Sequence, residues 1–523
     1  MMISRGILGL NFFFQSKSLT LIRKLSVQAA ASYKPTDDEY ARAKPYEQIP
    51  SLTKIELAKR FLPGGKFHEK SIVDVQVMLR DELGELYRIP GMFGQREILT
   101  TFDPNDVEII HRTEGAQPYR RGLETITYYR KKLRSDVYSV GGLILEQGDE
   151  WSKMRTAVNP ILMQPRTAKL YIPTIDGIVQ DFMANFPKLQ DENGEMPDNF
   201  QDLLNRWTLE SIVAIALEKR LGLMDLENRN EKAEKIAKTV RTIFELTAEF
   251  EFKPSVWRIY HTKAFKKLLQ AFDDLTDLSL ELIEAAKKNY QEETVNNDNN
   301  EESILFKLLK KDPRFASVMA FDMIFGGIDT TSSTLSGVMY CLAKNPDKQE
   351  ILRQELIKVL TDKNTPLTPE NMNHLPYLRA CIKEGIRVLP PVMGNMRRTG
   401  ENIVLRGYQV PKNVDVMLAL MHMYKDEKNF GSPKDFIPER WLKHQDENAC
   451  PRSLKQSHPF VYLPFGFGPR VCAGKRIAEM EIEVFLSRVI RNYRVEWHHE
   501  DMKVRSTLVN LPGNPLNFRL IQV

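Results

Sequence analysis

The stretch FGFGPRVCAG, residues 465–474, lies near the C-terminus, and the rest of the chain is organised around it. It places a single cysteine, Cys472, after two glycines and a basic residue, and a predicted helix follows from Lys475 to Arg491. Backbone N–H groups at a helix start stabilise negative charge, and the helix dipole adds to this effect. We therefore expect Cys472 to be held as a thiolate ligand.

The neighbours of this cysteine suit a large flat cofactor. Gly468 and Gly474 carry no side chain where such a group must approach the backbone. Phe465 would shield the sulfur, and Arg470 would pair with a carboxylate of the cofactor. A lone cysteine is by itself more often a buried structural residue, and only this surrounding pattern argues for a ligand.

The pattern F-x-x-G-x-R-x-C-x-G, from Phe465 to Gly474, resembles the haem-binding loop of the cytochrome P450 family at every fixed position. The resemblance implies haem b, iron protoporphyrin IX, with Cys472 as the axial ligand that supports cleavage of dioxygen. It also implies a mainly α fold with a minor β part, a single large cytochrome P450 fold around a buried haem. It covers essentially everything after about Tyr46.

A long helix is predicted from about Pro313 to Ala343, with GGIDTT at residues 326–331 in its middle. Two adjacent glycines cost about 1 kcal/mol each relative to alanine, so a cofactor pressed against the helix would offset them. Thr330 can turn its hydroxyl back to the carbonyl of Gly326, and Asp329 offers a proton source. The motif matches the oxygen-activation motif of the family, although a bare Thr-Thr pair is usually a polar packing face.

Three residues are candidates to bind the haem propionates. Trp151 and Arg155 are four apart, so both donors lie on one face of a predicted helix. An ordinary amphipathic helix would show the same spacing. The family resemblance implies that this pair contacts a propionate, and that Arg397 contacts one as well.

A buried ionic triad is implied by the resemblance for Glu384, Arg387 and Arg440. Its role would be to lock the segment that presents Cys472. An acid-base pair spaced i,i+3 on an exposed helix would mean little by itself.

Arg379 and Lys383 are four apart on the predicted helix from Pro376 to Leu389, which places two positive charges on one face. A solvated face is the simpler interpretation of such a pair. These positions resemble those at which mitochondrial members of the family dock an acidic adrenodoxin-type [2Fe–2S] ferredoxin.

The first 36 residues hold five basic residues and no acidic one, a composition typical of a mitochondrial transit peptide. A membrane anchor is the alternative, but the apolar run at residues 6–14 is far shorter than the roughly 20 residues that span a bilayer. A secretory signal is another. We predict a transit peptide at residues 1–32, cleaved between Leu25 and Ser32, a monooxygenase domain at 33–523, and peripheral association with the matrix side of the inner membrane.

The charge and the cysteine content argue against several other classes of protein. The formal net charge of +5 is accounted for by the leader, so the remainder is near neutral and does not favour nucleic-acid binding. The four cysteines occur without C-x-x-C spacing, which argues against a zinc site, a disulfide scaffold or a cysteine-ligated iron–sulfur cluster.

The remaining pattern predicts further elements along the chain. We expect a turn-rich lead-in at 46–67, helices at 71–80 and 104–111, and mainly helical structure at 172–288. Strands are expected at 87–89, 97–99, 408–411 and 414–421, a polar surface loop at 290–302, and a C-terminal turn at 506–511 that the resemblance places at the substrate pocket.

These features together predict a mitochondrial haem-thiolate monooxygenase that inserts one oxygen atom into a lipophilic substrate, with electrons from NADPH through a ferredoxin reductase and a ferredoxin. The run PPVMGNMR at 390–397 is similar to that of insect members linked to xenobiotic metabolism, although a sterol-like substrate fits an apolar pocket equally well. The alternatives are a haem-thiolate isomerase or dehydratase, which needs neither a proton relay nor a ferredoxin, and a non-enzymatic haem sensor.

Overall fold

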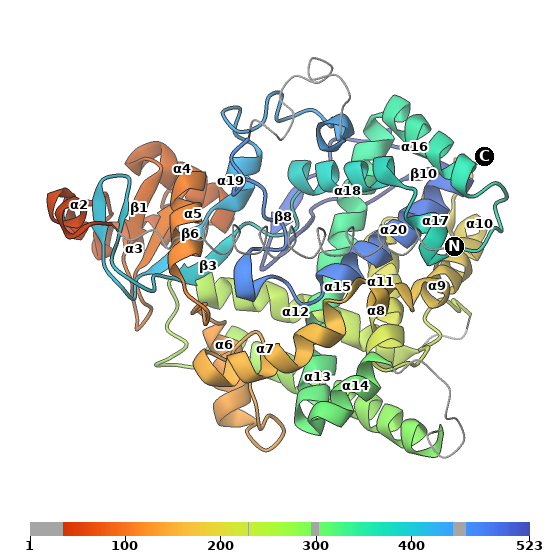
Figure 1. The fold of residues 1–523 in the computed structure, drawn as a ribbon, viewed down its shortest axis with the longest axis horizontal. Coiled ribbons are helices and arrows are strands. Elements are labelled where there is room, and N and C mark those ends of the chain that lie inside the picture. Colours follow the sequence, from red (N-terminus) through yellow and green to blue (C-terminus); the bar gives the residue numbers. More distant parts are fainter. Residues whose placement is uncertain (1–34, 228–229, 294–302, 443–456) are drawn as a thin grey trace, which may run out of the picture.

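The computed structural model describes residues 35–227, 230–293, 303–442 and 457–523 (Figure 1). Its helices are α2 (Asp37–Arg42), α3 (Lys54–Phe61), α4 (Ile72–Leu83), α5 (Pro104–Thr113), α6 (Glu124–Tyr128), α7 (Gly148–Leu162), α8 (Pro165–Lys169), α9 (Ile172–Ala184), α10 (Phe186–Leu189), α11 (Phe200–Ala216), α12 (Glu231–Phe252), α13 (Lys263–Glu293), α14 (Ile304–Lys311), α15 (Pro313–Lys344), α16 (Pro346–Val359), α17 (Pro369–Met372), α18 (Pro376–Val388), α19 (Leu420–Tyr424) and α20 (Lys475–Asn492).

The strands form one mixed sheet and three hairpin-like pairs. The sheet has the order β1-β2-β6-β3, in which β2 and β6 run parallel and the other neighbours run antiparallel. The pairs are β4 with β5, β7 with β10, and β8 with β9. The strand bounds are β1 (Leu86–Ile89), β2 (Ile98–Thr101), β3 (Asn395–Arg398), β4 (Ile403–Leu405), β5 (Tyr408–Val410), β6 (Asp415–Leu418), β7 (Tyr493–Glu496), β8 (Val504–Ser506), β9 (Asn510–Pro512) and β10 (Arg519–Gln522).

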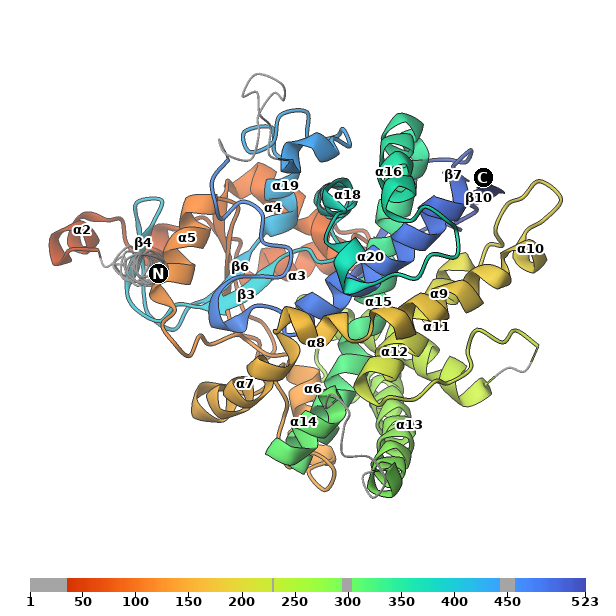
Figure 2. The same cartoon turned by 45° about the vertical axis from the view of Figure 1, so that its right-hand side comes forward.

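Helix α15 runs through the middle of the helical part and organises it. It contacts α11, α14, α18 and α20, and most of its side chains are buried (Figures 1 and 2). The main apolar core lies among these helices, and smaller apolar clusters lie around the sheet and the helices α3 to α5. The fold is therefore mainly α with a minor β part, as the sequence predicts.

Local sequence signals start several of these helices. Ser71 precedes α4, and its hydroxyl accepts the backbone N–H of Asp74, whose carboxylate accepts the backbone N–H of Ser71 in return. Asp312 precedes α15 and accepts the N–H of Arg314, while Pro313 occupies the first turn, where no backbone donor is needed. These contacts satisfy backbone groups that a helix end leaves unpaired.

Most of the expected elements are confirmed, and three expectations are wrong. Helices α4, α5, α15, α18 and α20 and strands β1 and β2 lie where the pattern predicts them. The lead-in at 46–67 contains a full helix, α3, which begins with a capping box between Thr53 and Glu56. Strand β6 ends at Leu418, and helix α19 replaces the rest of the strand expected at 414–421.

The third difference concerns the end of α13. This helix continues to Glu293, so it occupies the first part of the loop expected at 290–302. The remainder of that loop lies outside the described residues, as do residues 1–34 and with them the whole transit peptide predicted at 1–32. The predicted C-terminal turn is a short hairpin of β8 and β9.

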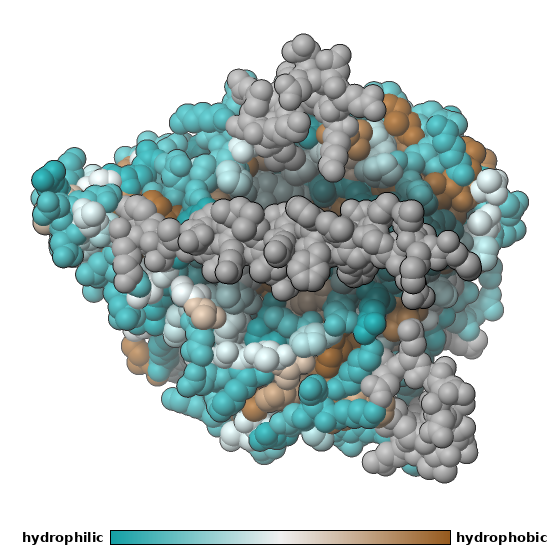
Figure 3. All heavy atoms as spheres, viewed as in Figure 1, coloured by the Kyte–Doolittle hydropathy of each residue, from teal (hydrophilic) through white to brown (hydrophobic). Residues whose placement is uncertain are grey.

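The surface is mostly hydrophilic on the face shown in Figure 3, with hydrophobic residues in small separate groups. Within the described part of the chain, no helix is long and apolar enough to cross a bilayer.

A close contact between α15 and α18 in the core predicts a sensitive position. A Cβ added at Gly385 on α18 would lie 2.7 Å from Cγ2 and 3.1 Å from Cα of Val338 on α15. Gly385→Ala should therefore lower the free energy of unfolding by about 1–3 kcal/mol, because a packed core does not absorb an extra methyl group. The measurement is the thermal or denaturant unfolding midpoint.

The matched control is Gly177→Ala on α9, where an added Cβ meets no atom within 4 Å. This substitution should leave stability unchanged or raise it by about 0.5–1 kcal/mol, since alanine favours a helix. Equal effects of the two substitutions would contradict the packing argument.

Candidate active site

The cysteine stretch forms a tight loop between a short 3₁₀ turn, η5 (Gly468–Arg470), and α20. The backbone N–H of Cys472 donates to the carbonyl of Phe465 at 2.9 Å, which closes the loop. Gly466 and Gly468 adopt φ of +74° and +69°, a region that glycine enters without strain. A side chain at Gly468 would also come within 3.0 Å of Glu114 Oε1. The loop geometry therefore depends on these two glycines.

The thiol of Cys472 lies within the protein yet keeps accessible surface, so it faces an interior space. Burial raises its pKa above the ordinary cysteine value. The backbone N–H of Gly474 and the charges of Arg155, Arg120 and Lys475 act in the opposite direction. Coordination to a metal ion would add the stabilisation that a buried thiolate needs.

Four arginines lie close enough to one another to interact in this region. Burial lowers the pKa of Arg470 to about 9, and repulsion from Arg120, Arg397 and Arg155 adds to the effect. Burial also lowers the pKa of Arg120 to about 10, again with a contribution from Arg397. A cluster of positive charge inside a protein is costly without anionic partners.

The protein partners of these arginines differ. The Arg397 Nε donates to Glu114 Oε2 at 2.8 Å, and both side chains are buried. The Arg155 Nη2 donates to the carbonyl of Val471 at 2.8 Å, while its buried Nε has no hydrogen-bond partner among the described residues. An unpaired buried donor beside the cysteine loop is a site at which an anionic group would be stabilised.

Arg470 is largely engaged by the protein itself. Its guanidinium donates to the carbonyls of Pro118 and Glu146, both at 2.9 Å, and lies 3.9 Å from the centroid of the Trp151 ring. Trp151 and Arg470 are thus brought together as a cation–π pair. A direct contact of either with a propionate remains a prediction.

The residues present fit haem. An interior thiol supplies the axial ligand, and the two propionates would bring negative charge to a region where buried guanidinium groups repel one another. The unpaired Arg155 Nε offers such a group a donor. We therefore expect Cys472 to hold the iron, and Trp151, Arg155, Arg397 and Arg470 to face the propionates.

The Thr330 hydroxyl donates to the carbonyl of Gly326 at 2.7 Å, as its spacing predicts. The two glycines of this motif, Gly326 and Gly327, have different surroundings. A Cβ at Gly327 would lie 2.9 Å from Ile212 on α11, so the close approach of α11 explains this glycine. A Cβ at Gly326 would meet no atom within 4 Å, so open space lies beside that part of α15.

The carboxyl group of Asp329 turns toward α11. It is fully buried, and its Oδ1 accepts a 2.8 Å hydrogen bond from the Asn205 side-chain amide. Burial raises the pKa of Asp329 to about 6, which leaves it able to exchange a proton near neutral pH.

The structure brings Glu384, Arg387 and Arg440 together. Glu384 Oε1 accepts from Arg387 at 2.9 Å and from Arg440 at 3.2 Å, and all three side chains are buried. Glu384 Oε2 also accepts from the Trp441 indole at 2.9 Å. The backbone N–H of Ile437 adds a further bond, so the carboxylate is fully surrounded by donors.

This cluster connects to the cysteine stretch through one aromatic residue. The Tyr462 hydroxyl donates to the carbonyl of Lys383 at 2.9 Å, and its ring lies 4.4 Å from that of Trp441. Tyr462 precedes the loop by three residues. This contact supports the predicted locking role of the triad.

Arg379 and Lys383 lie in unequal surroundings on α18. Arg379 makes two hydrogen bonds to the carboxylate of Glu483, at 3.0 and 3.1 Å. Lys383 is exposed, and its ammonium lies 5.9 Å from the centroid of the Trp441 ring. Of the two cations, Lys383 therefore has the more available charge.

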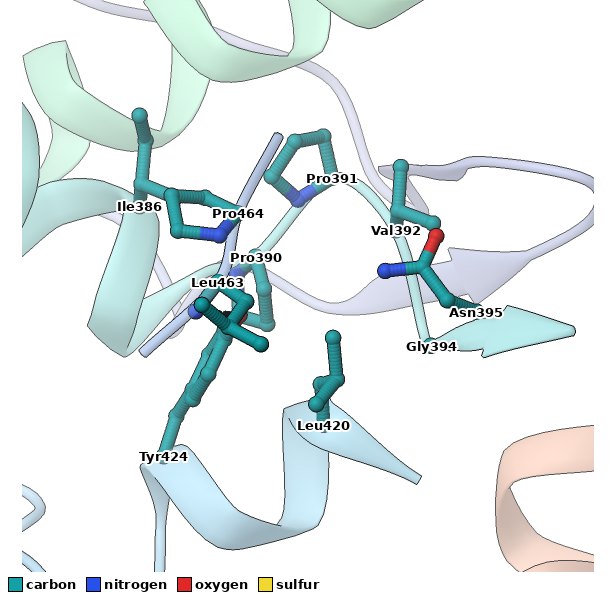
Figure 4. Close-up of a pocket in the computed structure, with 10 residues that line it drawn as sticks. All are labelled: Ile386, Pro390, Pro391, Val392, Gly394, Asn395, Leu420, Tyr424, Leu463 and Pro464. Atoms are coloured by element: carbon teal, nitrogen blue, oxygen red, sulfur yellow. Dashed lines mark hydrogen bonds between the residues drawn. The ribbon is translucent and has the colours of Figure 1, made fainter. Parts of the chain in front are cut away.

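An apolar cavity lies beside the cysteine stretch (Figure 4). It is lined by residues of α18, α19, the run at 390–395, and the segment before the loop: Ile386, Pro390, Pro391, Val392, Gly394, Asn395, Leu420, Tyr424, Leu463 and Pro464. One residue of the C-terminal hairpin, Asn510, anchors this run, because its amide donates to the carbonyl of Pro390 and its backbone N–H donates to that of Pro391. Its own carbonyl accepts from Ser333 on α15.

Arg120 and Asn205 were not singled out from the sequence. Arg120 follows a stretch without clear periodicity, and its place in the arginine cluster depends on contacts between distant segments. Asn205 sits in a predicted amphipathic helix, where a polar residue is normally read as solvent-facing. Its burial in an otherwise apolar face is visible only in three dimensions.

Residues 60–518 match the family model described as Cytochrome P450. The chain belongs to this family, whose members are haem-thiolate monooxygenases, and its cofactor is haem with a cysteine axial ligand.

Its relatives include several insect proteins. The chain is 41% identical to "Probable cytochrome P450 12a5, mitochondrial" of Drosophila melanogaster, over 93% of each chain. It is 39% identical to "Cytochrome P450 CYP12A2" of Musca domestica, over 96% of this chain and 94% of the relative. It is 40% identical to "Cytochrome P450 12b1, mitochondrial" of Drosophila acanthoptera, over 88% and 87%.

The ligand assignment predicts a spectroscopic outcome. Cys472→Ser should abolish the thiolate-type absorption band of the reduced carbon monoxide complex, because serine does not replace a thiolate as electron donor to iron. The control is Cys341→Ala on α15, a buried thiol whose pKa burial raises to about 12. Persistence of the band in Cys472→Ser, or its loss in the control, would place the ligand elsewhere.

Proposed function

We propose that this monooxygenase acts in mitochondria on a lipophilic substrate, with electrons delivered from NADPH by a ferredoxin reductase and an adrenodoxin-type ferredoxin. Two electrons and two protons are consumed for each dioxygen, one oxygen atom enters a C–H bond of the substrate, and the other leaves as water. Haem, when bound, supplies the activation of dioxygen. The observation that carries the proposal is the interior thiol of Cys472 beside a cluster of buried guanidinium groups.

The protons are proposed to pass by way of Asp329 and Thr330. Thr330 is held against the carbonyl of Gly326, next to the open space beside α15. Asp329, with a pKa of about 6, can take up a proton and release it at neutral pH. A haem-thiolate isomerase or dehydratase needs no such supply of protons, so this pair favours the monooxygenase over that alternative.

The electron carrier is proposed to dock on the exposed face of α18 and the start of α20. Lys383 and Arg476 are exposed there, and α20 begins three residues after Cys472. An acidic ferredoxin would be attracted to these cations, and a position close to the cysteine loop shortens the distance that an electron must cross.

Mitochondrial targeting is proposed for residues 1–32, with the monooxygenase domain at 33–523. The leader composition supports it, as do relatives whose names include the word mitochondrial. Import of the full chain into isolated mitochondria with loss of its N-terminus tests this proposal, and failure of import would exclude it.

Peripheral membrane association is proposed for an exposed apolar edge formed by Phe93, Val256, Ile259 and Tyr260. The segments that carry these residues contact each other, because the Gln95 amide donates to the carbonyls of Phe250 and Lys253. The four side chains are 37% to 79% exposed. Flotation with anionic vesicles tests this surface, and undiminished binding of Ile259→Ser would exclude it.

The substrate class is best resolved by ligand binding. A panel of sterols and a panel of lipophilic insecticides can be screened for the absorption change that follows displacement of the water at the iron. Relatives from insects favour the second panel. An apolar pocket next to the haem would suit both classes of compound. Positive compounds are then tested for NADPH consumption with reductase and ferredoxin, and no turnover of any binder would favour a haem sensor.

The docking proposal predicts that Lys383→Glu weakens ferredoxin binding roughly fivefold at low salt, and less at high salt, because exposed charges are screened. Arg379→Gln should have a smaller direct effect, since the guanidinium already pairs with Glu483. Binding is measured by titration of the ferredoxin into the haem-loaded enzyme. The control is Lys238→Glu on the exposed face of α12, and equal affinities of the two lysine variants would exclude the site.

The proton proposal predicts that Thr330→Ala lowers product formed per NADPH by about tenfold and raises the hydrogen peroxide released. The substrate is the compound with the largest absorption change in the panels. Thr334→Ala is the matched control, because Thr334 makes the same type of bond, to the carbonyl of Thr330 at 2.8 Å, one turn later. Unchanged coupling in Thr330→Ala would remove this hydroxyl from the proton route.

A further inference from the structure

Several polar side chains form hydrogen bonds between α11 and α15, two helices whose other contacts with each other are mainly buried and apolar. On α11, Gln201 and Asn205 are one turn apart, and on α15 their partners are Asp329, Ser332 and Ser336. Apolar side chains would pack between the two helices without any hydrogen bond. A buried amide is costly there unless it is hydrogen-bonded.

The hydrogen bonds in this contact run in one direction. The Ser336 hydroxyl lies within hydrogen-bond distance of two acceptors, Gln201 Oε1 at 2.6 Å and the backbone carbonyl of Ser332 at 2.8 Å. The Gln201 amide donates to Asn205 Oδ1 at 3.1 Å. The Asn205 amide then donates to Asp329 Oδ1 at 2.8 Å. This series of donors ends at Asp329, and bonds aligned in this way polarise one another.

The chain fixes the orientation of the Asn205 amide. The Gln201 Nε2 also donates to the Ser332 hydroxyl at 3.1 Å, so both of its N–H groups are used. Since Gln201 presents a donor to Asn205, the oxygen of Asn205 must face Gln201. The Asn205 N–H group is therefore directed to Asp329.

The charges that act on Asp329 come from α11 and α12. Arg241 lowers its pKa, as does the bond from Asn205, whereas Glu245 and Asp202 raise it. Arg241 and Asp202 form an ion pair at 2.7 Å, and Glu245 pairs with Arg505 at 2.6 Å. Asp329 Oδ2 is buried without a hydrogen-bond partner among the described residues, so the bond from Asn205 is the direct support of this carboxylate.

We propose that Asn205, held in place by Gln201 and Ser336, is a positioning residue that turns the Asp329 carboxyl toward α11 and stabilises its ionised form. The proposal rests on the proton role given to Asp329 above. Amide groups do not release protons at neutral pH, so the chain orients the carboxyl and does not conduct protons itself. A carboxyl group that is not kept permanently protonated by its burial can take up a proton between turnovers and release it during the reaction.

The test is an infrared titration of the haem-loaded enzyme from pH 5 to 8, without substrate or partner. The carboxyl band of Asp329 is isolated as the difference between the wild type and Asp329→Asn, because Asp106 and Glu251 also have pKa values raised by burial, to about 7. The wild-type midpoint is expected near 6. Asn205→Leu should raise it by about one pH unit, since a hydrogen bond to the charged form is lost.

Two variants separate positioning from general loosening of the core. Gln201→Leu should shift the midpoint upward by less than Asn205→Leu does, because the amide of Asn205 is then free to rotate. Thr208→Val removes a buried hydroxyl that donates to the backbone carbonyl of Asn205, and it should leave the midpoint unchanged. The proposal is overturned by an unshifted midpoint in Asn205→Leu, by an equal shift in Thr208→Val, or by the absence of any band lost in Asp329→Asn.

A kinetic measurement distinguishes this inference from the proposed function. With reductase, ferredoxin and 7-ethoxycoumarin as probe, the peroxide released per NADPH should follow pH with a midpoint that Asn205→Leu moves upward by the same amount as the infrared midpoint. A pH-independent ratio together with a shifted infrared midpoint would refute the role of Asp329 in proton delivery while upholding the role of Asn205.

Discussion

The burial of several guanidinium groups beside one thiol is the constraint on which the rest of this site depends. Arg120, Arg155, Arg397 and Arg470 come from four different segments, and the pKa values of all four are lowered mainly by burial. The protein offsets part of this cost with backbone carbonyls, a carboxylate and an aromatic ring. A dianionic cofactor offsets more, so binding of haem and folding of this region favour each other.

The ion cluster around Glu384 shows a different use of buried charge. The Glu384 carboxylate accepts hydrogen bonds from two arginines, an indole and a backbone N–H, so both of its oxygens are hydrogen-bonded. Buried ion pairs often stabilise a protein less than a packed apolar core of equal volume. We infer that this cluster is kept because its directional bonds fix how α18 meets the segment that leads into the cysteine loop.

Much of this arrangement could be predicted from the sequence, because its signals are local. The cysteine stretch, the bond from Thr330 to the carbonyl of Gly326 and the capped start of α4 each depend on neighbouring residues. Helix α3 was missed although Thr53 and Glu56 form a readable capping box. Strand β6 was extended too far because apolar residues continue into α19 without a turn signal.

Other features could not be predicted, because they depend on residues far apart in the sequence. Gly327 was attributed to pressure from a cofactor, and Ile212 from α11 fills that position. The sequence pairs Arg379 with Lys383 as a docking site and gives no sign of the bond that Arg379 makes to Glu483 from α20. Asn205 carries no local sign that it faces Asp329. Contacts between residues so far apart in the sequence can be identified only from the folded structure.

The bond between Arg379 and Glu483 has a consequence for the electron carrier that is proposed to dock on this face. A carrier must deliver one electron, depart, be reduced elsewhere and return, so a long residence time would slow the whole cycle. Affinity between related complexes is tuned mainly through the dissociation rate. A face on which one cation is already paired within the protein favours brief encounters, and the exposed Lys383 and Arg476 then provide the attraction at a distance.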